Sequence, residues 1–230
     1  MKGILRAAAC VPRLYLADPM KNAEAHLAML ERVKEAGAGL AVFPELSLTG
    51  YTCGDLFFQQ TLQEESVRAL LWLAERCPEG VTAVVGAPLR ANDGTGLYNC
   101  AVLLTRGLLL GAVAKTFLPN YNEFYEKRWF RSASDLRDGA AVRIGGTELP
   151  LARHQVFESA DGVRLGVELC EDLWTPLPPS TLLSLAGAEV IVNLSASNEL
   201  IAKREYRREL VCQQSARCLC GYVYVSAGNG

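Results

Sequence analysis

The chain has 230 residues, of which 50% are hydrophobic and 21% are charged, and its formal net charge is −2. These values describe an ordinary globular protein that is long enough for one α/β domain with a real core. A net charge so close to zero gives no reason to expect nucleic acid or an anionic membrane as a partner. The basic residues between Lys203 and Arg208 are interrupted by Glu205, and we interpret them as a solvated helix face.

The sequence also bears on the cellular compartment. No apolar run reaches the roughly 18 residues that a membrane-spanning helix needs. A short apolar run within residues 1–12 fits a first buried strand better than a signal peptide. The eight cysteines include no CxxC pair, and Cys218 and Cys220 are too close together for typical zinc spacing. We therefore expect a cytoplasmic protein with free thiols, most of them in the core, and no metal site.

Apolar segments of strand length recur along the chain, and amphipathic segments of helix length lie between several of them. Strands are expected at 4–11, 40–43, 82–86, 99–104, 109–114, 163–169, 190–194 and 222–226. Helices are expected at 19–36, 62–77 and 201–219. Asp18 is a plausible N-cap of the first helix, and Gly37 is its expected end.

Hairpins are mixed into this alternation. The dipeptide at 106–107 (Arg-Gly) predicts a turn between two strands, and segments 143–147 and 153–157 are candidates for a second hairpin. The combination predicts a layered α/β fold with mixed sheets, not a purely parallel sheet. The segment 116–138 breaks the pattern, because it is long, rich in aromatic residues and contains Pro119. We interpret it as a structured functional loop.

Three of the predicted strands end in residue types that serve in catalysis, namely Glu45, Lys115 and Cys170. Each also has an ordinary alternative: a helix-terminal acid for the glutamate, an exposed side chain for the lysine and a core thiol for the cysteine. A thiol attacks only as the thiolate and therefore needs a nearby cation or base. Glu171 and Asp172 would by themselves raise the pKa of this thiol, so a positive partner must come from elsewhere.

Taken together, these three residues meet one another's requirements. The lysine supplies the positive charge that the thiolate and a developing oxyanion need, and the glutamate supplies a base. The two histidines, His26 and His154, are predicted to lie in a helix and in a hairpin, away from the strand ends, which argues against a Cys-His triad. We therefore predict a site with Cys170 as nucleophile, Glu45 as base and Lys115 as charged helper.

The motifs around these residues resemble the signatures of the nitrilase, or carbon–nitrogen hydrolase, superfamily. Three motifs occur in the order found in that superfamily: FPELSLTGY around Glu45, the lysine shortly before a Leu-Pro pair, and ELCEDLW around Cys170. A narrower similarity is to the N-terminal glutaminase domain of glutamine-dependent NAD synthetases. It rests on LPNYNEFYEKRWF at 118–130 and GDLF at 54–57, and the whole resemblance runs from residue 4 to residue 230.

The resemblance implies a four-layer αββα sandwich that hydrolyses the side-chain amide of L-glutamine through a thioester on Cys170. Glu45 would transfer the protons and activate water. Lys115, with the backbone N–H after Cys170, would stabilise the oxyanion. The resemblance also assigns Glu123 as a supporting second glutamate, with Glu126 as its rival.

The resemblance further indicates residues for substrate binding. The subfamily pattern matches Tyr121, Ser197 and Lys203. Lys203 suits the carboxylate of a glutamine zwitterion, and Glu171 is the candidate for its ammonium group. Without the resemblance, Tyr121 would be interpreted as a packing residue and Ser197 as a turn or helix-cap residue.

In the same family, the ammonia would pass to an ATP-dependent synthetase domain that makes NAD from deamido-NAD. The present chain ends at 226–230 (SAGNG), and no P-loop, GxGxxG or Ser-Gly-Gly phosphate segment occurs in it. We expect one glutaminase domain, 1–230, that lacks its closing strands and the synthetase domain. This domain would need no cofactor, and ATP, Mg and deamido-NAD would belong to the synthetase domain. A homo-oligomer is expected.

Two other functions remain open from the sequence. One is a stand-alone amidase, carbamoylase or nitrilase with the same three residues and another substrate. The other is a catalytically idle binding or assembly module, against which the intact set of Glu45, Lys115 and Cys170 weighs.

Overall fold

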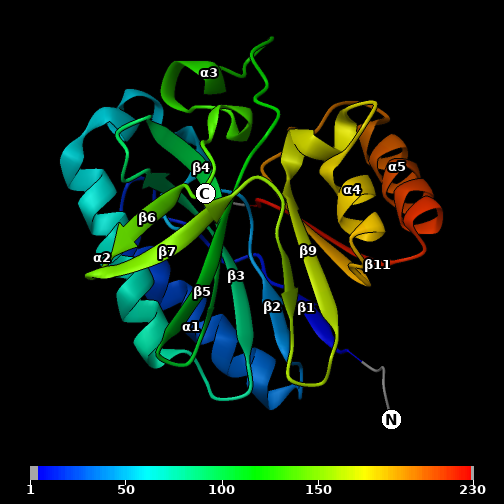
Figure 1. The fold of residues 1–230 in the computed structure, drawn as a ribbon, viewed down its shortest axis with the longest axis horizontal. Coiled ribbons are helices and arrows are strands. Elements are labelled where there is room, and N and C mark those ends of the chain that lie inside the picture. The colour runs from blue at the N-terminus through cyan, green and yellow to red at the C-terminus, as the bar shows by residue number, and fades with distance from the viewer. Residues whose placement is uncertain (1–4, 229–230) are drawn as a thin grey trace.

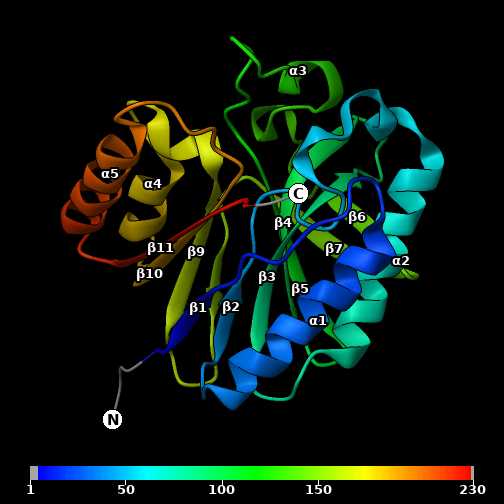
Figure 2. The same cartoon turned by 180° about the vertical axis from the view of Figure 1, so that it is seen from behind.

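The computed structural model describes residues 5–228 and contains two β-sheets packed face to face, with helices outside each sheet (Figure 1). The expected α/β fold with αββα layers is confirmed. Figure 2 shows the same layers from behind. The helices are α1 (Pro19–Glu35) and α2 (Gln60–Arg76) on one side, and α4 (Pro179–Leu185) and α5 (Lys203–Cys218) on the other. Shorter helical segments are η1 (Tyr51–Phe58), α3 (Glu126–Trp129), η2 (Ala133–Asp135) and η3 (Cys170–Trp174).

The two sheets differ in size and strand direction. The seven-stranded sheet consists, in spatial order, of β1 (Ala7–Ala9), β2 (Leu40–Val42), β3 (Thr82–Arg90), β4 (Leu97–Thr105), β5 (Leu108–Ala114), β7 (Thr147–Ala152) and β6 (Ala141–Ile144). The four-stranded sheet consists of β11 (Gly221–Ser226), β10 (Val190–Ser195), β9 (Arg164–Leu169) and β8 (Val156–Glu158). Strands β1, β2 and β3 are parallel, as are β9, β10 and β11, whereas β4 is antiparallel to both of its neighbours. The segment after β2 meets the end of β10, the neighbour of β9, where the backbone N–H of Glu45 donates to the carbonyl oxygen of Ser195 at 3.4 Å.

Side chains on opposite faces of the central strands belong to two different layers of the core. In β3, Val85 packs in the layer under α1 and α2, whereas Val84 packs between the two sheets. Val84 meets side chains of the facing sheet such as Val167 and Val192. Successive side chains of a strand point to opposite faces, and here both faces are buried. This explains why the strands read as continuous apolar runs in the sequence.

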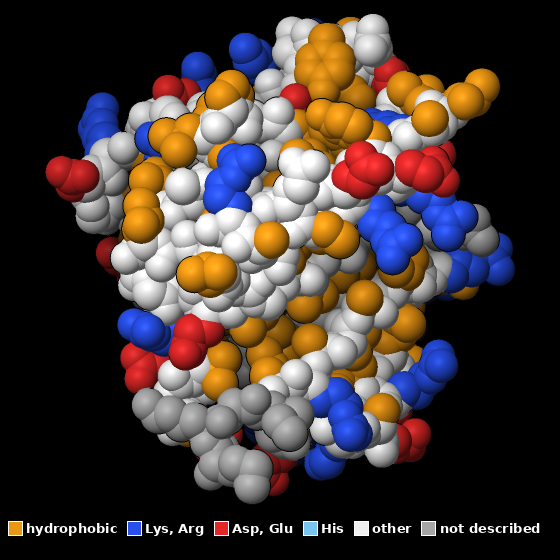
Figure 3. Space-filling model, turned by 90° about the vertical axis from the view of Figure 1, so that its right-hand side faces the viewer, with side chains coloured by type: hydrophobic (Ala, Val, Ile, Leu, Met, Phe, Trp, Pro, Cys, Tyr) orange, Lys and Arg blue, Asp and Glu red, His pale blue; other side chains and the backbone are white. Residues whose placement is uncertain are grey.

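The helices of the smaller sheet are less deeply embedded. Among the residues of α5, only Gln214 is buried. Leu185 at the end of α4 is 81% exposed, and Leu219 after α5 is 92% exposed. Figure 3 views this side of the molecule and shows apolar side chains among basic and acidic ones. No helix within residues 5–228 is both long and apolar enough to cross a membrane.

One predicted hairpin is wrong. Segment 143–147 does not pair with 153–157; instead β6 and β7 form the hairpin, and β8 pairs with β9. The turn between β6 and β7 is Gly145-Gly146, with φ values of 56° and 85°. Two adjacent residues with positive φ form the tight turn that suits a twisted hairpin, and glycine adopts them without steric cost. Ile4 of the first expected strand, and Asn229 and Gly230 of the expected C-terminal end, lie outside the described residues.

His26 of α1 supports the loop that follows β2. Its Nδ1 lies 2.6 Å from the carbonyl oxygen of Asn22, and its Nε2 lies 2.9 Å from Ser47 Oγ. A carbonyl oxygen only accepts, so Nδ1 donates, and Nε2 of the neutral ring accepts from the serine hydroxyl. The ring also stacks on Phe43, with centroids 4.2 Å apart. The histidine is therefore a buried structural residue, not part of a catalytic triad.

Acid is expected to destabilise the protein through His26. Burial lowers the pKa of His26 from 6.5 to about 4. Between these pH values the unfolded chain binds a proton that the folded protein does not, so the free energy of unfolding falls as the pH falls. The expected loss is about 2 kcal/mol between pH 7 and pH 5. Urea unfolding at both pH values should show a smaller loss for His26→Gln than for wild type; equal losses would contradict this role.

Candidate active site

Glu45 lies in a tight turn that follows β2 and crosses the middle of β3 at Gly86. Its side chain is fully buried. The turn packs directly on Gly86, where an added Cβ would lie 2.2 Å from the backbone nitrogen of Leu46. Leu46 itself has a φ of 50°, in the left-handed region that non-glycine residues rarely adopt. The close approach to Gly86 and the strained residue fix the direction of the glutamate side chain.

Cys170 lies immediately after β9, also in a strained turn. Its φ is 43°, and its backbone N–H donates to Asn193 Oδ1 at 3.1 Å. Asp172 closes the turn, because its Oδ2 accepts from the backbone N–H of Leu169 at 3.0 Å. Its other oxygen accepts from the backbone N–H of Phe117 at 2.8 Å. Asp172 therefore ties the turn that contains Cys170 to the loop after β5.

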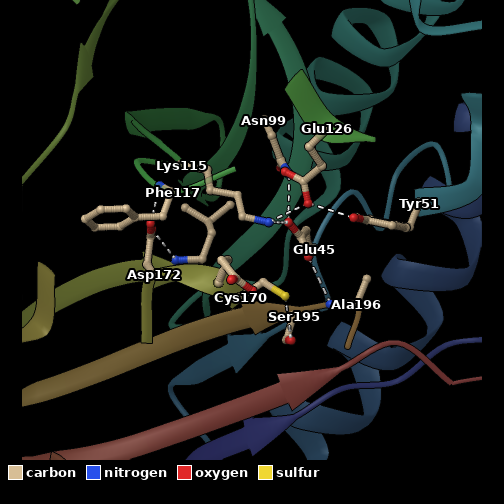
Figure 4. Close-up of polar contacts among 12 residues, drawn as sticks. Glu45, Tyr51, Asn99, Lys115, Phe117, Glu126, Cys170, Asp172, Ser195 and Ala196 are labelled. Carbon is tan, nitrogen blue, oxygen red and sulfur yellow. Dashed lines mark hydrogen bonds and ion pairs between the residues drawn. The ribbon is translucent and has the colours of Figure 1, made fainter. Parts of the chain in front are cut away.

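Lys115 follows β5 and lies between two buried carboxylates (Figure 4). Its Nζ is 2.6 Å from Glu45 Oε1 and 2.6 Å from Glu126 Oε1. Asn99 Nδ2 donates to Glu45 Oε1 at 2.7 Å, and the Tyr51 hydroxyl donates to Glu126 Oε1 at 2.7 Å. Each carboxylate thus has several donors, as buried charges require.

The charges of the site favour a protonated thiol at rest. Burial raises the pKa of Cys170 to about 12, and the negative charge of Glu45 adds to this effect. Burial alone would lower the pKa of Lys115, but the carboxylates of Glu126 and Glu45 raise it well above its ordinary value. One ammonium group therefore faces two carboxyl groups and a neutral thiol. Such a site is suited to a base-assisted attack by the thiol.

The model of the carbon–nitrogen hydrolase family matches residues 6–230. The chain belongs to this family. It is 42% identical over 231 residues to the glutamine-dependent NAD(+) synthetase of Mycobacterium tuberculosis, covering 99% of this chain and 33% of that protein. The human glutamine-dependent NAD(+) synthetase is 28% identical over 229 residues, covering 96% of this chain and 32% of that protein. The chain thus spans about a third of the length of these curated relatives.

Solved structures agree with the family assignment. A glutamine-dependent NAD(+) synthetase from Cytophaga hutchinsonii matches with a TM-score of 0.83 and 28% identity, covering 96% of this chain and 36% of that chain. An amidase from Nesterenkonia matches with a TM-score of 0.75 and 19% identity, covering 97% of this chain and 76% of that chain. The second match shows the fold alone. Both support the αββα architecture of this carbon–nitrogen hydrolase.

The supporting glutamate requires a correction. The structure places Glu126, and not Glu123, beside Lys115. After β5 the chain extends outward and returns at α3, where the backbone N–H of Glu126 donates to Pro119 O at 3.2 Å. Glu123 lies at the outer end of this excursion, is exposed and pairs with Asn198. Glu126 therefore occupies the position beside Lys115 that was expected for Glu123.

The residues predicted to bind substrate fall into two groups at the surface beside the site. The Tyr121 hydroxyl donates to Glu171 at 2.9 Å. Lys203 pairs with Asn198, and its Nζ lies 5.2 Å from the centre of the Trp174 ring. Ser197 Oγ lies 3.5 Å from the carbonyl oxygen of Asn198.

A cavity of about 590 Å³ adjoins the first of these groups. Tyr121 and Glu171 line it, whereas Glu45, Lys115 and Cys170 do not. The cavity lies against the loop that follows β5, and the side chains of Glu45, Lys115 and Cys170 are buried. Within residues 5–228 no group of three His, Cys, Asp or Glu side chains is arranged to bind a metal ion.

Several polar residues of the site were missed by the sequence analysis. Asn99 of β4 donates to Glu45. On β10, Asn193 accepts from the backbone N–H of Cys170, and Ser195 contacts the Cys170 sulfur. The available signal was a polar residue inside an otherwise apolar strand, because buried polar groups need partners. Tyr51 carried no such signal, since a tyrosine in an aromatic segment is as easily a packing residue.

Proposed function

We propose that this chain hydrolyses the side-chain amide of L-glutamine and supplies the ammonia to an NAD synthetase domain of its parent protein. The observation that carries the proposal is the convergence of Glu45, Lys115 and Cys170 in one buried site. Support for the substrate comes from the relatives, which are named glutamine-dependent NAD(+) synthetases. ATP, Mg and deamido-NAD would then bind in the synthetase domain, outside this chain.

The first half of the reaction forms a thioester. The Cys170 sulfur attacks the carboxamide carbon of glutamine while Glu45 accepts the thiol proton. Glu45 then gives this proton to the leaving nitrogen, and the carbon–nitrogen bond breaks to release ammonia. The Lys115 ammonium and the backbone N–H of Glu171 stabilise the negative oxygen of the tetrahedral intermediate.

The second half of the reaction releases glutamate. A water molecule attacks the thioester carbon and transfers a proton to Glu45, and the sulfur leaves as the second tetrahedral intermediate breaks down. Glu45 returns the proton to sulfur. Glu126 does not exchange protons with the substrate in this scheme; it keeps Lys115 in place.

Substrate orientation depends on the two surface groups. The Lys203 ammonium binds the α-carboxylate of glutamine, and Ser197 donates a hydrogen bond to the same end of the substrate. Glu171 binds the α-ammonium group, with the Tyr121 hydroxyl limiting the movement of its carboxylate. With the α-ammonium and α-carboxylate groups held in this way, the length of the glutamine side chain places its amide carbon beside the Cys170 sulfur.

A glutamine analogue in which a diazo-ketone replaces the amide tests the proposal. The sulfur of Cys170 would displace nitrogen gas and form a stable thioether, so peptide mass spectrometry should find one labelled cysteine among the eight. Excess glutamine should slow the labelling, and Cys170→Ala should remove it. Labelling that persists in Cys170→Ala would contradict the assignment of the nucleophile. Faster turnover of aliphatic nitriles or N-carbamoyl amino acids than of glutamine would contradict the substrate.

A further inference from the structure

The Cys170 sulfur contacts a hydroxyl group that the reaction described above does not use. Ser195 Oγ lies 3.2 Å from Cys170 Sγ and is in a position to donate to it (Figure 4). Ser195 is fully buried at the end of β10. It lies two residues after Asn193, whose Oδ1 accepts a hydrogen bond from the backbone N–H of Cys170. Alternate residues of a strand share a face, so one face of β10 binds both the backbone and the sulfur of the nucleophile.

Tyr224 of the neighbouring strand β11 determines where this hydroxyl points. Its hydroxyl oxygen is 2.6 Å from Ser195 Oγ. A serine hydroxyl has one hydrogen, and if that hydrogen points to the sulfur, the tyrosine must be the donor to Ser195 Oγ. Burial raises the pKa of Tyr224, so this phenol keeps its proton. The hydrogen bonds then run in one direction from Tyr224 through Ser195 to Cys170, an arrangement in which each bond strengthens the next.

The charges nearby show why the sulfur needs such a donor. The Lys115 ammonium is already paired with Glu45 and Glu126. A thiolate formed at Cys170 would add a further negative charge in a buried site, and burial already disfavours it. A neutral hydroxyl stabilises the thiolate without introducing another charge that must be compensated.

We propose that Ser195 is a catalytic residue that donates a hydrogen bond to the Cys170 thiolate, and that Tyr224 is a positioning residue that directs the serine hydroxyl. The inference rests on the proposed role of Cys170 as nucleophile. The bond matters whenever sulfur carries negative charge, which is during attack on the amide and during departure from the second tetrahedral intermediate. It weakens in the thioester, where the sulfur is neutral.

The rate at which iodoacetamide alkylates Cys170 depends directly on how much of the sulfur is thiolate. Rates at this cysteine, measured by peptide mass spectrometry from pH 6 to pH 10, should fall about tenfold at pH 8 in Ser195→Ala, with the whole profile shifted to higher pH. Tyr224→Phe should shift the profile in the same direction by a smaller amount. Ser195→Thr, which keeps the hydroxyl, should remain within about threefold of wild type.

The matched control is Ser66→Ala. Ser66 is also a buried serine, but it lies on α2 and its hydroxyl has no hydrogen-bond partner among residues 5–228. Its removal should leave the alkylation profile of Cys170 unchanged. Thermal unfolding of each variant reports whether the fold is intact. If Ser195→Ala fails to fold, Tyr224→Phe decides the outcome, because it keeps the ring and removes only the directing hydroxyl.

An unchanged profile in folded Ser195→Ala, or in Tyr224→Phe where Ser195→Ala does not fold, would overturn the inference. The measurement does not depend on the substrate, so it is separable from the test of glutamine hydrolysis. A shifted profile in a protein that the diazo-ketone does not label would support the role of Ser195 and contradict the substrate assignment. Labelling by the diazo-ketone together with an unchanged alkylation profile would support the substrate assignment and contradict the role of Ser195.

Discussion

Lys115→Met is expected to abolish glutamine hydrolysis and to lower the free energy of unfolding by about 3–5 kcal/mol at pH 8. The lysine is the cation between Glu45 and Glu126, and all three side chains are buried. Methionine keeps the length and most of the apolar volume of the side chain but removes the charge. Two buried carboxylates would then lack their counter-charge, which costs far more than the loss of a surface ion pair.

The loss of stability should depend on pH in a defined direction. Burial already raises the pKa of Glu126 to about 7, and without the ammonium group of Lys115, which lowers it, this pKa rises further above that of the unfolded chain. Groups with a raised folded-state pKa stabilise the fold at low pH and lose this contribution as the pH rises through the folded-state pKa. The deficit of Lys115→Met relative to wild type should therefore be larger at pH 8 than at pH 5.

Guanidinium unfolding at the two pH values measures this deficit, and a glutaminase assay measures the loss of activity. Lys127→Met is the matched control, since Lys127 lies on α3, close to Glu126 in the sequence, but is exposed. It should change neither the stability nor the activity by a large amount. A deficit of equal size at pH 5 and pH 8 would show that packing, and not uncompensated charge, explains the effect.

Most of the strands, and the proximity of Glu45, Lys115 and Cys170 at their ends, could be predicted because their signals are local. An apolar run that ends at a charged or thiol-bearing residue marks the end of a buried strand, and the residues after β2, β5 and β9 lie together in the sandwich. Helix α1 was similarly clear. The Asp18 side chain accepts from the backbone N–H of Lys21 at 3.1 Å, and Gly37 adopts a φ of 68° just after the helix.

The partners of these residues depended on the path of the chain in three dimensions. Residues 116–138 contain little regular structure, so no periodicity indicates which side chains point inward. Contacts with distant strands determine their path, for example the hydrogen bond from the backbone N–H of Arg131 to Leu97 O at 2.8 Å. For this reason, the sequence could not decide between Glu123 and Glu126, whereas the return of the loop brings Glu126 inward beside Lys115.

Polar residues within the strands present a related problem. Asn193 and Ser195 face Cys170, yet the sequence does not tell which face of β10 is directed towards the site. That choice follows from the parallel register with β9, in which Leu194 is opposite Leu169. Because side chains alternate, a shift of one residue would turn both polar groups away from the nucleophile.

Glutamine substitutions at the two glutamates of this loop should have very different effects. Glu126→Gln is expected to lower kcat for glutamine hydrolysis by about 100-fold, because Lys115 loses a charged partner that positions it towards the oxyanion. KM should change little, since Glu126 is buried behind the lysine and does not contact the substrate in the proposed scheme. Glu123→Gln should keep kcat within about threefold, because it alters one exposed contact with Asn198.

Steady-state kinetics of the two variants, with thermal unfolding to verify the fold, separates the alternatives. Each substitution removes one negative charge while preserving size, so each variant is the control of the other. Burial raises the pKa of Glu126, and a neutral side chain at this position should therefore be tolerated by the fold better than by catalysis. A larger loss of kcat in Glu123→Gln than in Glu126→Gln would return the supporting role to Glu123.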